Sequence, residues 1–273
     1  TNISNEGRRA MSTIPLAKGY NPEKITYPGY LSVKIDGVPI RCDVMYENGE
    51  RSISLRTRQG NENFSALPQF TSLVDALITA EVLEPGEHTF VAEVTHPDFV
   101  AFKDISGIIR RQTPQAGLVL NIFDYCAHAH NDPFEKREAE LYRMMCNVLS
   151  DSFRGVQQLY VRDAREFGRV RAYLLEAQPD CEGLVYRSAD AQFKPGMRHW
   201  DYQKILIKPT ADLRVHSYYE ATCGRTGEGK RMVGRINCHH PYGEPHGWDG
   251  ARVIGVGPGR MTHAERISEW EKY

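Results

Sequence analysis

Apolar and polar residues alternate along several short stretches in the first half of the chain, as they do in strands with one buried face. These stretches are residues 31–35, 38–46, 52–56, 89–94 and 119–123. Between the second and third, Asn48-Gly49 predicts a type I′ hairpin turn, because both central residues of that turn adopt positive φ. The pattern predicts antiparallel sheets.

Other segments have a helical period. Leu67 to Leu83 carries apolar residues at 67, 70, 73, 74, 77 and 78, which predicts a helix with one buried face. Asp132-Pro133-Phe134-Glu135 predicts a second helix, with Asp132 as its cap and Pro133 in its first turn, running to about Leu149. Further helices are predicted at 102–111 and 164–177, and strands at 183–186 and 202–207. The fold class is therefore α+β, with helices flanking the sheets.

The pattern changes after Pro209. Short strand candidates at 213–220, 232–238 and 251–256 are separated by glycine-rich turns. This change predicts two domains, residues 1–210 and 211–273. A small β-barrel is the natural architecture for about five short strands with a helix.

Composition limits the class of protein. The 273 residues carry a net charge of −1 and are 41% hydrophobic, which is ordinary for a soluble globular chain. Any contact with nucleic acid must come from local basic patches, since there is no overall basic excess. The six cysteines show no Cys-x-x-Cys spacing, and no apolar run reaches membrane-spanning length. We expect a cytoplasmic, monomeric enzyme without a membrane partner.

Lys34-Ile-Asp-Gly37 is the first candidate for chemistry. A lysine in a lined pocket can be held neutral and attack an electrophile. Taken alone, the tetrad is equally consistent with a surface strand and a salt-bridging lysine. Six other residues lie at predicted strand ends or on late strands, and each alone has a structural explanation. Together they describe a nucleotide site, with cations for phosphate, carboxylates for Mg²⁺ and an aromatic surface for a base: Arg58, Glu93, Phe123, Glu182, Lys204 and Lys208.

The order and spacing of these motifs, from about Ile14 to Trp270, resemble the covalent nucleotidyltransferase superfamily, specifically the compact ATP-dependent DNA ligases of phages and bacteria. The matching segments are Lys34-Ile-Asp-Gly37, Thr57-Arg-Gln-Gly60, Phe90-Val-Ala-Glu93, Phe102 to Arg111, Ile122-Phe-Asp124, Glu182 to Arg187, Lys204 to Pro209, and Glu220 to Ile236. The resemblance implies an ATP-grasp-like nucleotidyltransferase domain followed by an OB-fold domain. It also implies nick sealing in duplex DNA, as in repair or replication, through a lysyl-AMP intermediate. ATP and Mg²⁺, for which Mn²⁺ can substitute, are the implied cofactors, and nicked double-stranded DNA is the implied partner.

The resemblance also implies roles for particular residues. Lys34 is the nucleophile, kept neutral by neighbouring cations, and Glu93 and Glu182 hold the metal. Lys208, which directly precedes Pro209 as the second lysine does in the ligase pattern, is expected to matter more for the α-phosphate than Lys204. The nucleotide-binding set is Ser32, Lys34, Asp36, Gly37, Arg41, Arg58, Glu93, Phe123, Glu182, Lys204 and Lys208. The DNA-binding set is Arg58, Arg110, Arg111, Arg225, Lys230 and Arg231.

The chain departs from the family pattern at several positions. Pro39 lies where an arginine is common, so either Arg41 or another side chain is expected to stand in for it. Arg187 replaces a usual lysine, and three residues rather than one separate Lys204 from Lys208. The usual C-terminal OB motif is not visible, so the second domain is either minimal or truncated.

Alternative functions stay open. NAD-dependent ligases are disfavoured, because the chain has neither room for their extra modules nor a four-cysteine zinc spacing. An RNA ligase or capping-type guanylyltransferase of the same superfamily is one alternative. A nucleic-acid-binding module without catalysis is another.

Overall fold

The computed structural model describes residues 13–60, 67–99, 102–127, 132–207, 213–224, 226–239, 253–259 and 261–273. Contacts between Cα atoms divide the chain into two compact units, Thr1–Lys208 and Pro209–Tyr273. Lys208 and Arg225, two of the predicted site residues, lie outside the described residues. Within the described part of the chain, no helix is both long and apolar enough to cross a membrane.

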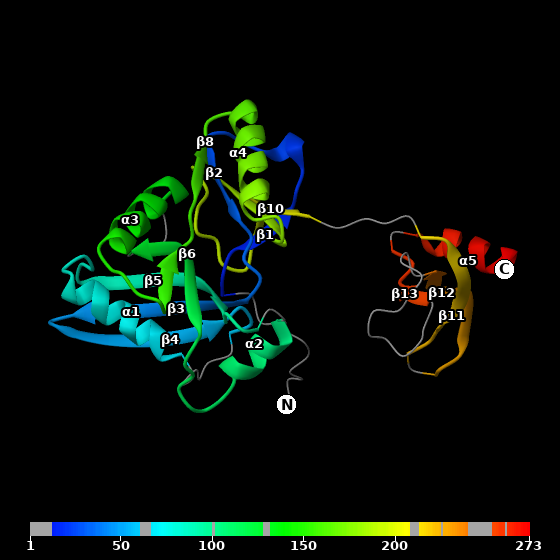
Figure 1. The fold of residues 1–273 in the computed structure, drawn as a ribbon, viewed down its shortest axis with the longest axis horizontal. Helices are drawn as coiled ribbons and strands as arrows, with labels where there is room; N and C mark the ends of the chain where they lie inside the picture. Colours follow the sequence, from blue (N-terminus) through cyan, green and yellow to red (C-terminus); the bar gives the residue numbers. More distant parts are fainter. Residues whose placement is uncertain are drawn as a thin grey trace, which may run out of the picture. The chain divides into compact units, whose positions relative to one another are not determined.

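The first unit contains two five-stranded sheets (Figure 1). The first has the order β4-β3-β5-β6-β7, and its strands are β3 (Val38–Glu47), β4 (Glu50–Thr57), β5 (Gly86–Thr95), β6 (Val119–Ala127) and β7 (Phe153–Gly155). Its pairs are antiparallel as predicted, except that β7 runs parallel to β6. Apolar side chains of α1 (Pro68–Thr79), α2 (Phe102–Ile109) and α3 (Phe134–Cys146) complete its core.

The second sheet has the order β1-β10-β9-β2-β8. Its strands are β1 (Leu16–Gly19), β2 (Gly29–Val33), β8 (Leu159–Val161), β9 (Gly183–Ser188) and β10 (Arg198–Leu206), and a short 3₁₀ turn, η1 (Pro22–Lys24), lies between β1 and β2. β1 and β10 are parallel, and the other pairs are antiparallel. Phe167 and Leu174 of α4 (Ala164–Ala177) pack against Leu31, Leu184 and Tyr186 of this sheet.

Local chemistry explains several element boundaries. Asn48 and Gly49 have φ values of 52° and 80°, so the predicted hairpin turn is confirmed. Helix α1 ends at Thr79, before the predicted Leu83, because Glu81 adopts a left-handed conformation with φ 55°. Helix α4 has the predicted bounds, and Asp163 caps it by accepting a hydrogen bond from the Glu166 backbone N–H.

The predicted start of α3 is wrong by one position. Pro133, rather than Asp132, is the N-cap residue, and no side chain caps this end of the helix. The Asp132 carbonyl instead accepts a hydrogen bond from Arg137 Nη1 at 2.6 Å. The helix ends at Cys146 rather than Leu149.

Two strands are longer than predicted. β5 and β6 pair from His88↔Ala127 to Thr95↔Val119, so Glu93 and Phe123 lie inside strands and not at their ends. The ladder contains one irregularity, because Val91 is opposite Asp124 while Ala92 is opposite Ile122. Phe123 is therefore the extra residue of a β-bulge. Bulges commonly re-aim a side chain next to a functional site.

The second unit contains a three-stranded antiparallel sheet and one helix among its described residues. The strands are β11 (Val215–Thr222), β12 (Gly229–His239) and β13 (Val253–Val256), and β12 is central. Helix α5 (His263–Lys272) starts with a capping box of Thr262 and Glu265, and Arg266 Nε donates to the Val233 carbonyl at 2.7 Å. No closed barrel forms within this described part, so the predicted OB-fold barrel remains a prediction.

Candidate active site

Both sheets of the first unit contribute residues to one open pocket. Its lining consists of Ala17, Ser32, Val33, Lys34, Ile35, Glu93, Phe123, Val156, Gln158, Val185, Arg187, Tyr202 and Lys204. Five of these residues were predicted site residues: Ser32, Lys34, Glu93, Phe123 and Lys204. Residues as distant in the sequence as Ser32 and Lys204 thus line one pocket, because the strands that carry them lie in the same sheet.

Strand register explains why the second sheet supplies so many lining residues. Val185 of β9 lies opposite both Ser32 of β2 and Lys204 of β10. Arg187, two residues further along β9, lies opposite Tyr202. Residues directly opposite one another, and residues two apart, project from the same face of a sheet. One face of the second sheet therefore forms a wall of the pocket.

Lys34 follows directly after β2. Its backbone N–H donates to the Gly183 carbonyl at 2.8 Å, which fixes the chain beside the start of β9. Its Nζ forms an ion pair with the Glu182 carboxylate, and the Lys34 side chain remains 24% exposed. The predicted nucleophile and one predicted metal ligand are thus in direct contact, on a lysine that solvent or a ligand can reach.

Glu93 lies on β5 next to this pair. Burial raises the pKa of Glu93 to about 8, and the nearby carboxylates of Asp36 and Glu182 add to the rise. Lys34 and a hydrogen bond from the Gly37 backbone oppose it. A Cβ on residue 37 would lie 2.4 Å from the Val94 carbonyl oxygen, so only glycine permits this approach of backbone to β5. The predicted motif and Glu93 are therefore packed together.

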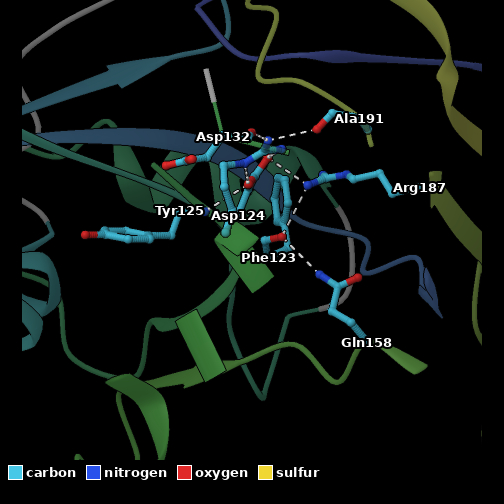
Figure 2. Close-up of polar contacts among 8 residues, drawn as sticks. Phe123, Asp124, Tyr125, Asp132, Gln158, Arg187 and Ala191 are labelled. Carbon is cyan, nitrogen blue, oxygen red and sulfur yellow. Dashed lines mark hydrogen bonds and ion pairs between the residues drawn. The ribbon is translucent and has the colours of Figure 1, made fainter. Parts of the chain in front are cut away.

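Phe123 is held by its own backbone. In Figure 2, its carbonyl oxygen accepts a hydrogen bond from Gln158 Nε2 at 3.0 Å and a longer one from Arg187 Nη1 at 3.5 Å. The Arg187 guanidinium lies 5.5 Å from the centre of the Phe123 ring. Because the bulge leaves Phe123 without a residue opposite it in the ladder, these two side chains take the place of a cross-strand partner.

Asp124, the next residue, joins the two sheets through a buried ion cluster. Its carboxylate accepts from Arg187 Nη1 at 2.7 Å and from Arg137 Nε at 3.0 Å, and all three side chains are buried (Figure 2). Arg137 Nη1 also donates to the carbonyls of Asp132 and Ala191. Arg187, identified in the sequence only as a replacement for lysine, is thus a structural cation shared by β9 and β6.

Lys204 lines the pocket from β10. The register between β10 and β9 is regular from Tyr202 to Leu206, so no bulge lies between Lys204 and the end of the described strand.

Other predicted residues lie outside this pocket. Arg41 forms an ion pair with Asp43 at 2.8 Å and donates to the Thr13 carbonyl, so its position does not support a role as the missing motif arginine. Asp36 and Gly37 are beside Glu93 but do not line the pocket. Exposed positions are occupied by Arg58 after β4, Arg110 and Arg111 after α2, and Lys230 and Arg231 on β12.

Sequence reasoning missed part of the lining. Tyr202 and Val185 could have been found, because both lie on predicted strands and Tyr202 shares a strand face with Lys204 two residues later. Val156 and Gln158 lie between β7 and β8, in a segment that has no periodic pattern. Nothing in the sequence identified them.

No protein-family model matches the chain, and the curated proteins include no match. Solved structures do match. Two, named "Pmar-Lig_Pre." and "Pmar-Lig_PreS3", have TM-scores of 0.71 and 0.72 and are 19% identical over 96% of this chain, which spans 60% of theirs.

Two further matches cover most of both chains. A Lig E DNA ligase has a TM-score of 0.61 and 18% identity, with 93% of this chain and 87% of that chain covered. A chlorella virus DNA ligase–adenylate has a TM-score of 0.52 and 17% identity, with 96% and 87% covered. The chain therefore has the fold of the ATP-dependent DNA ligases, and the predicted α+β class is confirmed.

Replacing Asp124 by asparagine should destabilise the first unit by about 3–5 kcal/mol, because two buried guanidinium groups lose their counter-charge while the side-chain shape is kept. Urea unfolding followed by circular dichroism measures this. Asp132→Asn is the control, because its carboxylate is exposed and lies 3.9 Å from Lys136. That change should cost less than about 1 kcal/mol. Equal losses of unfolding free energy in the two variants would contradict the role given to Asp124.

Glu93→Gln should stabilise the metal-free and nucleotide-free protein increasingly as pH rises. Below pH 4.5 the Glu93 carboxyl is protonated in both the folded and the unfolded state. Between 4.5 and about 8 only the unfolded state loses its proton, so the wild type loses stability. The difference in unfolding free energy between variant and wild type should grow by up to about 1.4 kcal/mol per pH unit and level off above pH 8. A difference that stays constant from pH 5 to 8 would argue against a protonated Glu93.

Proposed function

We propose that this protein is an ATP-dependent DNA ligase that seals nicks with a 5′-phosphate and a 3′-hydroxyl in duplex DNA. The observation that carries the proposal is the accessible Lys34, which forms an ion pair with Glu182 and lines a pocket together with Glu93, Phe123 and Lys204. The ligase fold supports the same reaction class. The names of two further neighbours, a mycobacterial DNA ligase D and a bacteriophage T7 DNA ligase, describe complexes with ATP.

In the first step, Lys34 forms a bond from Nζ to the α-phosphorus of ATP. The bond from that phosphorus to the bridging oxygen breaks, and pyrophosphate leaves. The amine must first lose a proton, and the Glu182 carboxylate that contacts it can accept that proton. An oxygen of the 5′-phosphate then attacks the α-phosphorus and releases Lys34. Finally the 3′-hydroxyl attacks the 5′-phosphate, and AMP leaves.

The pocket walls suit a purine nucleotide. Phe123 offers an aromatic face to a base, and the apolar Val33, Val156 and Val185 line the same space. Lys204, with Lys208, supplies positive charge for the α-phosphate, and Ser32 adds a hydroxyl. Positioning and charge are the main contributions that such a transfer needs from the protein.

The carboxylates fit a divalent cation. Glu182 contacts Lys34 and Glu93 lies near both, and the described residues contain no group of three or more metal-ligating side chains. Mg²⁺ commonly uses one or two carboxylates together with substrate phosphates and water, so this donor set suits it, and Mn²⁺ has similar preferences. A bound ion would neutralise charge on the phosphate oxygens.

DNA would be held through backbone phosphates. Arg58, Arg110 and Arg111 of the first unit and Lys230 and Arg231 of the second are exposed cations, and Arg225 belongs to the same basic segment. A protein with net charge −1 lacks a general attraction for DNA, so these local cations carry the contact. We propose that the second unit is an OB-type domain and that the protein acts as a monomer in the cytoplasm, or in the host cytoplasm if it is viral.

Lys34→Arg should abolish covalent labelling by α-labelled ATP with Mg²⁺, because arginine keeps the charge but cannot become a neutral nucleophile. Labelling is read after denaturing electrophoresis, and circular dichroism controls for folding. A labelled variant would exclude Lys34 as the nucleophile. Parallel reactions with GTP, and with nicked RNA in place of nicked DNA, distinguish a guanylyltransferase or an RNA ligase.

Lys208→Ala should slow self-adenylation by at least about a hundredfold, as loss of a transition-state charge contact does. Lys204→Ala should be milder. Rates of self-adenylation and of sealing pre-adenylated nicks are compared for the two variants. If Lys204→Ala is more damaging in the first step, the lysine on β10 that lines the pocket is the essential phosphate contact and the assignment to Lys208 is wrong.

A further inference from the structure

A hydrogen bond fixes the orientation of the Gln158 amide at the pocket. Gln158 lies in the irregular segment between β7 and β8, and its Nε2 donates to the Phe123 carbonyl at 3.0 Å. A carbonyl oxygen accepts and cannot donate, so the amide nitrogen must face it. The other end of the amide, Oε1, can only accept, and no hydrogen bond to it is present among the described residues.

The other oxygens of the pocket are less suited to read a base. Four lining side chains carry oxygen: Ser32, Glu93, Gln158 and Tyr202. The Tyr202 hydroxyl is hydrogen-bonded to Arg187, whose guanidinium can only donate. Glu93 is grouped with Lys34 and Asp36, where the phosphates react. Ser32 can donate as well as accept, so its hydroxyl does not discriminate between an amino group and a carbonyl oxygen on a base.

We propose that Gln158 Oε1 accepts a hydrogen bond from the exocyclic amino group of adenine and so selects a 6-aminopurine nucleotide. The proposal rests on the proposed function, because it assumes that Phe123 is the platform for the base. Gln158 donates a hydrogen bond to the backbone carbonyl of Phe123, which ties the position of the acceptor oxygen to that of the aromatic ring (Figure 2). A 6-oxopurine such as guanine would present an oxygen to Oε1 and leave both acceptors unsatisfied.

Two substitutions distinguish recognition of the base by Gln158 from its hydrogen bond to Phe123. Gln158→Met is similar in length but has no amide, so it loses both the donor to Phe123 and the acceptor for the base. Gln158→Glu keeps an acceptor and loses the donor to the Phe123 carbonyl. Glu138→Gln is a matched control. Glu138 borders a second hollow that Gln158 also lines, but it does not line the nucleotide pocket.

The experiment compares ATP with purine riboside triphosphate, which lacks only the 6-amino group. The ratio of kcat/KM for enzyme labelling by the two nucleotides should be about tenfold in the wild type, which corresponds to one net hydrogen bond. It should fall to about one in Gln158→Met and stay near tenfold in Gln158→Glu and Glu138→Gln. An unchanged ratio in Gln158→Met, or an equal slowing for both nucleotides, overturns the proposal. So does a loss of the ratio in Glu138→Gln, because the effect would then not require contact with the base.

Equilibrium binding separates this inference from the proposed function. Calorimetry with ATP and with purine riboside triphosphate should show the same tenfold preference in the wild type and its loss in Gln158→Met. A protein that binds with this preference but forms no covalent label would overturn the proposed function and leave the role of Gln158 supported. Equal binding of the two nucleotides by the wild type overturns the inference.

Discussion

The site depends on one buried carboxylate. Asp124 of β6 holds Arg187 of β9 and Arg137 of α3, and these three charged side chains are buried together. Burying charges is costly unless each is paired and hydrogen-bonded, so the two sheets can be joined here only in the arrangement that satisfies all three groups. The distance between the strands that carry Phe123 and Val185 follows from that arrangement.

The bulge at Phe123 belongs to the same arrangement. Its position in β6 places Asp124 opposite Val91 and leaves Phe123 out of the ladder, free to line the pocket. Arg187 then contacts the Asp124 carboxylate and the Phe123 carbonyl with one Nη1 atom, and its guanidinium lies 4.2 Å from the centre of the Tyr202 ring. A lysine would supply one charge but not a planar group able to stack and bond at once. Arg187 therefore has a structural function that a lysine at this position could not perform.

Much of the fold could be predicted because alternation and helical periodicity reflect burial directly. Seven of the ten strands of the first unit, the Asn48-Gly49 turn and helix α4 follow from local patterns, whereas the short strands β1, β7 and β8 were not predicted. The boundaries of α1 and α3 could not be predicted, since a left-handed Glu81 and the Arg137 bond to the Asp132 carbonyl decide them. The second unit was harder still, because short glycine-rich strands carry little periodic signal. Its described part is a three-stranded sheet with a helix.

Some residues of the candidate site could likewise be predicted from the sequence, and others could not. Lys34, Glu93, Phe123 and Lys204 were found from motif order, and the structure gathers them in one pocket. Gln158 could not be found, because its position depends on a backbone carbonyl that only the bulge makes available.

Charge explains how the pocket would complement a nucleotide. Burial keeps Glu93 protonated near neutral pH, so the side chains around Lys34 carry less negative charge than their sequence suggests. Lys34 and Lys204 face the same space, and the charge of Arg187 is balanced by Asp124. In the proposed function, an incoming triphosphate would meet Lys204, the Lys34–Glu182 ion pair and a mostly neutral Glu93, and a divalent cation arriving with it would favour ionised Glu93. If the proposed function holds, binding of the metal–nucleotide complex and release of the Glu93 proton are coupled, since each favours the other.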